Sequence, residues 1–280
     1  MSKTVHDSKT AGPIRTLPDF KNPPAVETYL GVHFDPLEGW KLPHYGLFWN
    51  RIRHDYPKVE VRPPIASREG MSFEFVGMTE PQGELNIPAR CWFINQDNMR
   101  LIQVQNNIFI HNWRRHAGTG EPYSHYDDLR PIFEQEWHRF TEFVRDENIG
   151  IPKANLCEVA YINHLDRGVG WQGLAELPEV FPCWSGVTSG GYLPSPQAVA
   201  IRAFYRMKEP EGVLEVSLQP ALRQADAKDI FQLTLTGRCK PMSSDESSII
   251  SALDAAREWV VRGFTDFTST KMHEIWGRTI

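Results

Sequence analysis

The chain has 280 residues, of which 41% are hydrophobic and 23% are charged, and this composition excludes an intrinsically disordered protein. The net charge of -5 excludes a general basic field for nucleic acid, although it allows a local basic patch. The four cysteines lie far apart without a Cys-x-x-Cys pair, which argues against a zinc site or a disulfide framework.

Residues 1–20 are polar and lack periodicity, so we predict a flexible tail there. The N-terminus has no apolar secretion signal, and no stretch reaches the roughly 18 apolar residues of a membrane helix. The sequence therefore predicts a cytoplasmic protein that does not contact a membrane.

Residues 21–150 show strand patterns followed by one long helix pattern. Alternating apolar and polar residues predict strands over 26–34, 58–63, 72–78, 90–95 and 100–113. A short helix is expected to begin at Pro43 and to end before Pro57. Apolar residues three and four positions apart predict a helix over 127–148, with Asp127 or Asp128 as its cap.

Residues 151–280 repeat this order of elements. A strand is predicted over 154–165, and a Gly-, Pro- and Trp-rich loop follows over 166–196. Further strands are predicted over 198–208, 213–219 and 229–239. Ser243 and Glu246 have the spacing of a capping box at the start of a second long helix.

These patterns predict an α+β protein in which each half is an antiparallel sheet packed by one long amphipathic helix. The lobes are 21–150 and 151–280, and the alternative is that both share one continuous curved sheet. By analogy alone, this resembles the TATA-binding-protein-like and helix-grip arrangements.

The end of the strand over 100–113 carries the first candidate site. Asn112, Trp113, Arg114 and Arg115 combine hydrogen-bonding groups, an aromatic plane and fixed charges, which suit phosphate or nucleotide recognition. The alternative is that Trp113 lies in the core and the arginines are a solvated strand end.

Two further sets of polar residues are candidates for binding. Asn163 and His164 end a strand beside the long loop, where either a site or a structural turn fits. Arg202, Arg206 and Arg238 belong to alternating polar rows that predict one polar sheet face. Such a face either recognises a partner or is simply solvated.

Catalytic signatures are missing from the sequence. It contains no Gly-x-Ser-x-Gly elbow, no phosphate-binding loop of the Gly-x-x-x-x-Gly-Lys type and no His-Glu-x-x-His motif. We therefore expect neither a cofactor nor a metal, and we assign no catalytic residue.

Several separate stretches together resemble one protein family. They are residues 22–24, 31–34, 90–93, 101–105 with 112–114, and 158–163. The sequence resembles a sporadically distributed family of uncharacterised prokaryotic proteins of similar length, over nearly the whole chain after the tail. That family has no established activity, and its scattered distribution implies accessory genes, including phage-defence and toxin–antitoxin loci.

The sequence thus favours a non-enzymatic binding protein that engages a protein or a nucleotide-containing partner. One alternative is an enzyme or small-ligand sensor with a pocket between sheet and helices, formed by Asn112, Arg114, Asn163, His164 and the 166–196 loop. A second is nucleic-acid binding on the polar sheet face.

Overall fold

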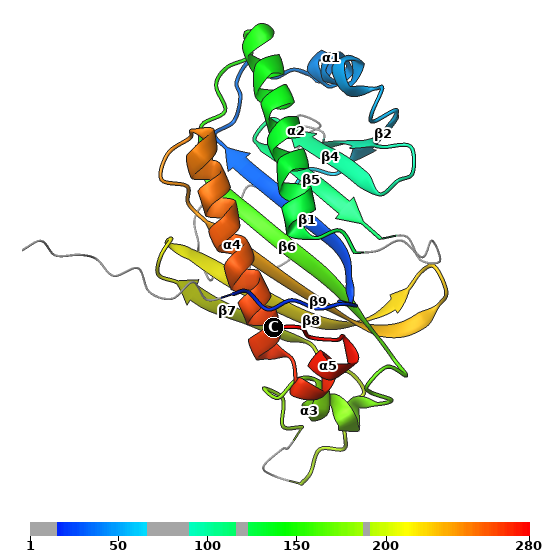
Figure 1. Ribbon diagram of the computed structural model, residues 1–280. Coiled ribbons are helices and arrows are strands. Elements are labelled where there is room, and N and C mark those ends of the chain that lie inside the picture. Colours follow the sequence, from blue (N-terminus) through cyan, green and yellow to red (C-terminus); the bar gives the residue numbers. More distant parts are fainter. Residues whose placement is uncertain (1–15, 66–89, 116–122, 187–190) are drawn as a thin grey trace, which may run out of the picture.

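Every named strand belongs to one antiparallel sheet in the computed structural model, which describes residues 16–65, 90–115, 123–186 and 191–280. The strands are β1 (Ala25–Phe34), β2 (Lys58–Arg62), β3 (Arg90–Ile94), β4 (Arg100–Gln105), β5 (Ile108–Arg114), β6 (Ala154–Asp166), β7 (Ile201–Met207), β8 (Gly212–Arg223) and β9 (Lys228–Cys239). Their order is β2-β3-β4-β5-β1-β6-β9-β8-β7 (Figure 1). The predicted α+β class is confirmed, with both halves in one continuous sheet.

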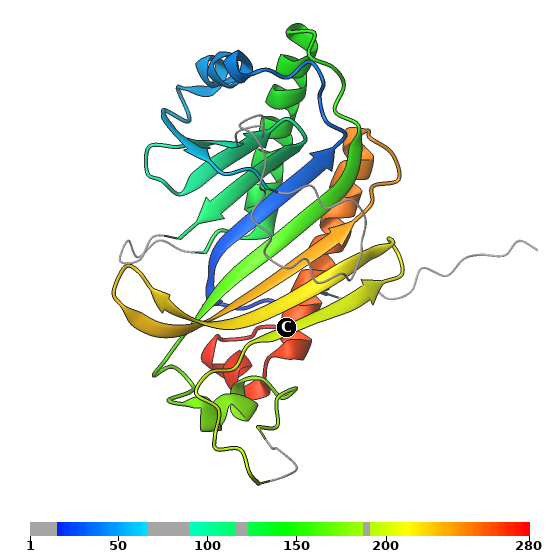
Figure 2. The same ribbon diagram turned by 180° about the vertical axis from the view of Figure 1, so that it is seen from behind.

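The two long helices, α2 (Tyr126–Asp146) and α4 (Glu246–Phe267), cover the same face of the sheet (Figures 1 and 2). We call this the helix face and the opposite side the open face. The shorter helical segments are α1 (Leu42–Ile52), η1 (Leu174–Glu176), α3 (Leu177–Val180) and α5 (Thr270–Ile275). Two of them, η1 and α3, lie within the stretch 166–196 that was predicted as a loop.

The two halves repeat one arrangement and are joined at the centre of the sheet. The strand before each long helix pairs with the first strand of its half, β5 with β1 and β9 with β6. The first strands β1 and β6 also pair with each other. The buried hydrophobic residues of both halves form one cluster, so the predicted lobes share a core.

Helix α2 buries the apolar stripe that its sequence predicts, including Phe133 and Phe140. Its start differs from the prediction. The N-cap residue is His125, whose side chain makes no capping hydrogen bond. Asp127 and Asp128 lie instead in the first turn, where carboxylates interact favourably with the helix dipole.

Helix α4 is capped by Asp245 rather than by the predicted Ser243. The Asp245 carboxylate accepts a hydrogen bond from the Ser248 backbone N–H at 2.9 Å. The helix approaches β9 closely at Gly237, where an added Cβ would lie 2.7 Å from the Ala256 carbonyl oxygen. Glycine at this position therefore sets the distance between helix and sheet.

The single strand predicted over 100–113 is wrong, because the chain reverses within it. Strands β4 and β5 form a hairpin in which Gln105 pairs with Ile108, and Asn106 and Asn107 make the turn. Asparagine is a common turn residue because its side chain hydrogen-bonds nearby backbone. The strand predicted over 72–78 lies outside the described residues.

The segment before β1 crosses the helix face and pairs with the end of the chain. Phe20 forms an isolated antiparallel bridge with Arg278, and its ring packs 5.5 Å from Phe264 and 6.3 Å from Trp276, between centroids. The predicted tail over 1–20 is thus described only from residue 16, and Phe20 is buried. None of the helices in the described ranges combines the length and apolarity needed to span a membrane.

Candidate ligand-binding site on the open face

The open face carries polar side chains because successive strand residues point to opposite sides of a sheet. On β1, Leu30 and Val32 join the core beneath the helices, whereas Tyr29 and His33 line a pocket on the other side. Figure 2 shows the sheet from this side. A polar strip with residues from both halves of the chain therefore crosses the middle of the open face.

A chain of side-chain hydrogen bonds, which we call the relay, runs along this strip from β3 to β1. Arg90 Nη1 and Trp92 Nε1 each donate to Gln103 Oε1 at 2.9 Å. Gln103 Nε2 donates to Asn112 Oδ1 at 2.7 Å, and Asn112 Nδ2 donates to Glu27 Oε1 at 2.6 Å. Each amide accepts on one side and donates on the other, so the relay fixes the position of the Glu27 carboxylate.

Three arginines surround the Trp92 ring at the other end of the relay, and we call them the arginine cluster. The Cζ atom of Arg62 lies 4.5 Å from the ring centroid, and those of Arg90 and Arg114 both lie 5.6 Å from it. Arg62 pairs with Glu60. Among the described carboxylates, none lies within 4.0 Å of a nitrogen of Arg90 or Arg114. The ring thus holds guanidinium groups whose charges are only partly compensated.

Burial and the repulsion between neighbouring guanidinium groups both lower pKa values in the arginine cluster. Burial lowers the pKa of Arg90, and the charge of Arg62 lowers it further. Burial also lowers the pKa of Arg114, against the attraction of Glu27 and Glu60. The Nε groups of Arg90 and Arg114 are buried without a hydrogen-bond partner in the described structure. A bound anion would supply both the missing charge and the missing acceptors.

Glu27 is similarly short of partners. Burial raises the pKa of Glu27, while the hydrogen bond from Asn112 and the charge of Arg114 oppose this shift. Glu27 is directly opposite Arg114 in the β1–β5 register, but their charged groups lie beyond salt-bridge distance. Its carboxylate therefore keeps acceptor capacity that the described side chains do not use.

A second set of charged side chains, which we call the ionic chain, continues across the open face from β1 to β7. His33 Nε2 and Glu158 Oε1 are 3.0 Å apart, and Arg238 Nε donates to Glu158 Oε2 at 3.0 Å. Arg238 Nη1 donates to Glu215 Oε2 at 2.7 Å, and Arg202 Nε donates to Glu215 Oε1 at 2.8 Å. From Glu158 to Arg202, carboxylate and guanidinium groups alternate along this chain.

The centre of the ionic chain is buried, and its opposite charges are paired. The side chains of Glu158 and Arg238 are only 7% and 12% exposed. Burial alone would raise the pKa of Glu158, but the hydrogen bond and charge of His33, together with Arg238, lower it to about 2. Gly31 leaves space for this carboxylate, since a Cβ there would lie 3.2 Å from Glu158 Cγ.

The relay and the His33 end of the ionic chain enclose a cavity of about 230 Å³, which we call the open-face pocket. Ile65 and Ile110 also line it. Gln105 holds Ile65 in place by accepting from its backbone N–H at 2.9 Å and donating to its carbonyl oxygen at 3.1 Å. This is a concave site with converging polar groups, as small-ligand sites generally are.

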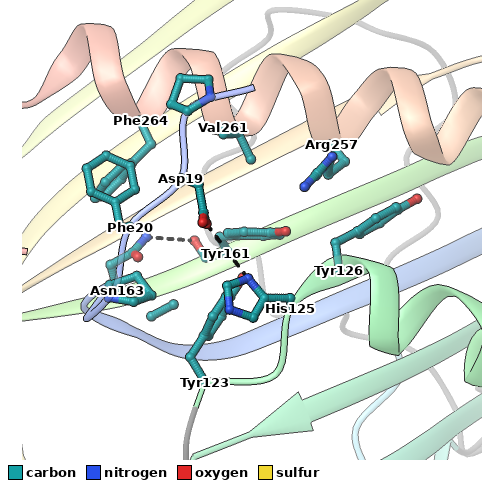
Figure 3. Close-up of a pocket in the computed structure, with 13 residues that line it drawn as sticks. Asp19, Phe20, Tyr123, His125, Tyr126, Tyr161, Asn163, Arg257, Val261 and Phe264 are labelled. Atoms are coloured by element: carbon teal, nitrogen blue, oxygen red, sulfur yellow. Dashed lines mark hydrogen bonds and ion pairs between the residues drawn. The ribbon is translucent and has the colours of Figure 1, made fainter. Parts of the chain in front are cut away.

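A smaller cavity of about 50 Å³ lies on the helix face between α4, the start of α2 and the segment before β1 (Figure 3). Tyr161 and Asn163 from β6 and Arg257 from α4 face it. His125 and Asp19 also line it, and His125 Nδ1 and Asp19 Oδ1 approach to 3.8 Å. Its volume is that of a few water molecules, so the open-face pocket is the better candidate for a ligand.

Four of the predicted site residues belong to the open-face pocket or to the charged groups beside it. Asn112 and Arg238 line the open-face pocket, and Arg114 belongs to the arginine cluster. Arg202 ends the ionic chain and is more exposed. The sequence therefore identified residues of both the arginine cluster and the ionic chain, without showing which side chains contact one another.

The other predicted site residues lie apart from this pocket. Trp113 is in the core, and Arg115 lies 5.9 Å from its ring. Asn163 is on the helix face, where its Nδ2 donates to the Leu233 carbonyl oxygen at 3.0 Å. Burial lowers the pKa of His164, the charge of Arg223 lowers it further, and the charge of Asp166 opposes this shift. Arg206 is exposed at the edge strand. Asn112 and Asn163 thus face opposite sides of the sheet and form no common pocket.

Residues essential to the pocket were not identified from the sequence, notably Trp92, Arg90, Glu27 and Glu158. One signal was present, because Glu158 interrupts the otherwise apolar run at the start of β6. The others become neighbours only through strand pairing, such as Trp92 with Gln103.

The described ranges contain no group of three or more His, Cys, Asp or Glu residues that could hold a metal ion. Cys91, Cys157 and Cys239 are buried free thiols, and Cys183 is exposed. No protein-family model and no curated protein matches the sequence. Function is therefore inferred from the geometry of the open-face pocket.

Proposed function

We propose that this protein is a non-enzymatic binding protein whose open-face pocket binds a phosphate-bearing ligand. The observation that carries this proposal is the arginine cluster, in which Arg90 and Arg114 have no described carboxylate partner. Guanidinium groups bind phosphate oxygens through two parallel hydrogen bonds, and the Trp92 ring preorganises them. The nucleotide-containing partner expected from the sequence belongs to this class of ligand.

The shape and charge of the open face support a small ligand rather than a nucleic-acid polymer. The pocket is a cavity of about 230 Å³ rather than an extended groove. In the ionic chain, Arg202 and Arg238 are already paired with carboxylates, so uncompensated positive charge is concentrated at the arginine cluster. A polymer that follows the sheet would instead need phosphate contacts along its whole length.

The residues around the pocket support binding rather than catalysis. Its described lining includes no Ser, Thr, Cys or Lys side chain that could act as a nucleophile. The lining imidazole, His33, shares its carboxylate partner Glu158 with Arg238.

Titration calorimetry with pyrophosphate and ADP tests the proposal. We expect Arg114→Gln to weaken the binding of both ligands at least about 10-fold, because a charge-assisted hydrogen bond contributes about 1.5–3 kcal/mol. Arg206→Gln is the matched control, since it removes an equal charge from the exposed edge strand. The proposal would be wrong if neither ligand bound, or if both variants lost affinity equally.

A further inference from the structure

We infer that the ligand of the open-face pocket is a nucleotide-sized molecule with hydrogen-bond donors at the end opposite its phosphate, and that Glu27 recognises these donors. This inference rests on the proposed function, because the arginine cluster must hold the phosphate. It adds the chemistry of the second end of the ligand and a residue that determines specificity.

The first reason is the incomplete hydrogen bonding of Glu27. Asn112 is the only described side chain that donates to its carboxylate, at 2.6 Å. An ionised carboxylate can accept about four hydrogen bonds. Glu27 lines the pocket, so its remaining acceptor sites are available to a ligand that brings N–H or O–H groups.

The second reason is that the two unsatisfied ends of the pocket do not neutralise each other. Glu27 and Arg114 are register partners, yet Arg114 turns its guanidinium toward the Trp92 ring and donates to the Asn98 carbonyl oxygen at 3.4 Å. One end of the cavity therefore lacks an anion and the other lacks donors. A single ligand with a phosphate and a donor-bearing group would satisfy both ends at once.

The spacing of the two ends sets the size of this ligand. Trp92 lies on β3 and Glu27 on β1, which are separated by three strand steps in the sheet. Neighbouring strands are about 4.8 Å apart, so the two backbones are about 14 Å apart. Arg114 on β5 lies one strand from Glu27, but a ligand that contacts both Arg90 on β3 and Glu27 on β1 must be longer than inorganic phosphate, as a nucleotide is.

The third reason is the relay, which connects both ends of the pocket. Gln103 accepts from Arg90 in the arginine cluster and donates to Asn112, which holds Glu27. Gln103 and Asn112 are 6% and 2% exposed, so their orientations are fixed by burial as well as by hydrogen bonds. We assign Asn112 as a positioning residue that acts through Glu27.

The experiment compares pyrophosphate with ADP, GDP, CDP and UDP by titration calorimetry, in wild type and in Glu27→Gln. Pyrophosphate reports the arginine end alone, and the nucleoside diphosphates report both ends. We expect at least one nucleoside diphosphate to bind the wild type about 10-fold tighter than pyrophosphate, which is the typical contribution of a hydrogen bond to a charged group. Glu27→Gln should remove most of this preference and change pyrophosphate affinity by less than about twofold.

A second variant and a control keep the result interpretable. Asn112→Ala tests the positioning role and should reduce the same preference for nucleoside diphosphates. Glu211→Gln removes a carboxylate from an exposed pair outside the pocket and should change no affinity. A dideoxy nucleoside diphosphate then distinguishes the source of the donors, because it keeps the amines of the base and lacks the sugar hydroxyls.

Two results would overturn the inference and leave the proposed function intact. In the first, pyrophosphate and all nucleoside diphosphates bind the wild type equally. In the second, Glu27→Gln strengthens pyrophosphate and nucleotides alike, which would make Glu27 a counter-ion of Arg114 that competes with every anion. Failure of pyrophosphate and all nucleotides to bind would instead overturn the proposed function itself.

Discussion

On the open face, the ionic chain and the arginine cluster contain similar residues in opposite arrangements. In the ionic chain, Arg238 lies between Glu158 and Glu215 and contacts both at 3.0 Å or less. In the arginine cluster, Arg90 and Arg114 lie against a ring and beside another arginine, without a described carboxylate partner. Charges that are compensated within the protein maintain its structure, whereas charges left uncompensated at a pocket indicate where a ligand supplies the partner.

The largest expected effect is a loss of stability when the ionic chain is broken. Glu158→Gln removes the charge between His33 and Arg238, and we expect the free energy of unfolding to fall by about 3–5 kcal/mol. Urea denaturation measures this change. Glu211→Gln, at the exposed pair with Arg206, should cost less than about 1 kcal/mol. Equal costs for the two variants would show that the ionic chain does not stabilise the fold more than a surface pair.

A somewhat smaller effect is expected from pH. The pKa of Glu158 is lowered from 4.5 to about 2 in the folded protein, so the unfolded chain binds the proton first as the pH falls. The stabilisation from Glu158 is complete above about pH 4.5 and is lost toward pH 2, and it amounts to about 3 kcal/mol. Urea denaturation between these pH values should show a shallower decline for Glu158→Gln than for the wild type. Parallel declines would contradict the assignment.

The smallest expected effect on stability comes from removing a charge of the arginine cluster. Arg90→Gln relieves the repulsion from Arg62 and removes a buried charge, so we expect the free energy of unfolding to change by less than about 1 kcal/mol. The measurement is urea denaturation in phosphate-free buffer, with Glu158→Gln as the reference. If Arg90→Gln destabilises the protein as much as Glu158→Gln, the arginine cluster has a structural role.

The sequence predicted the features that depend on local backbone geometry. The alternation that predicted a strand over 26–34 also separates Leu30 in the core from Glu27 and Tyr29 on the open face, because neighbouring strand residues point to opposite sides. The spacing of apolar residues likewise identified both long helices and their buried stripes. These properties need no knowledge of which elements lie side by side.

The composition of the pocket could not be predicted in this way, because it depends on strand order. Gln103 contacts both Trp92 and Asn112 only because β3, β4 and β5 are neighbours in the sheet. The missed turn at Asn106 and Asn107 hid this hairpin. With β4 and β5 treated as one strand, no sequence pattern could place these side chains together.

The bridge between Phe20 and Arg278 brings the beginning and the end of the described fold to one place on the helix face (Figure 1). A linker attached at Ile280 therefore leaves the molecule from the side away from the open-face pocket. Immobilised on a sensor surface through such a linker, the protein would present the pocket to the solution and keep it accessible to dissolved nucleotides.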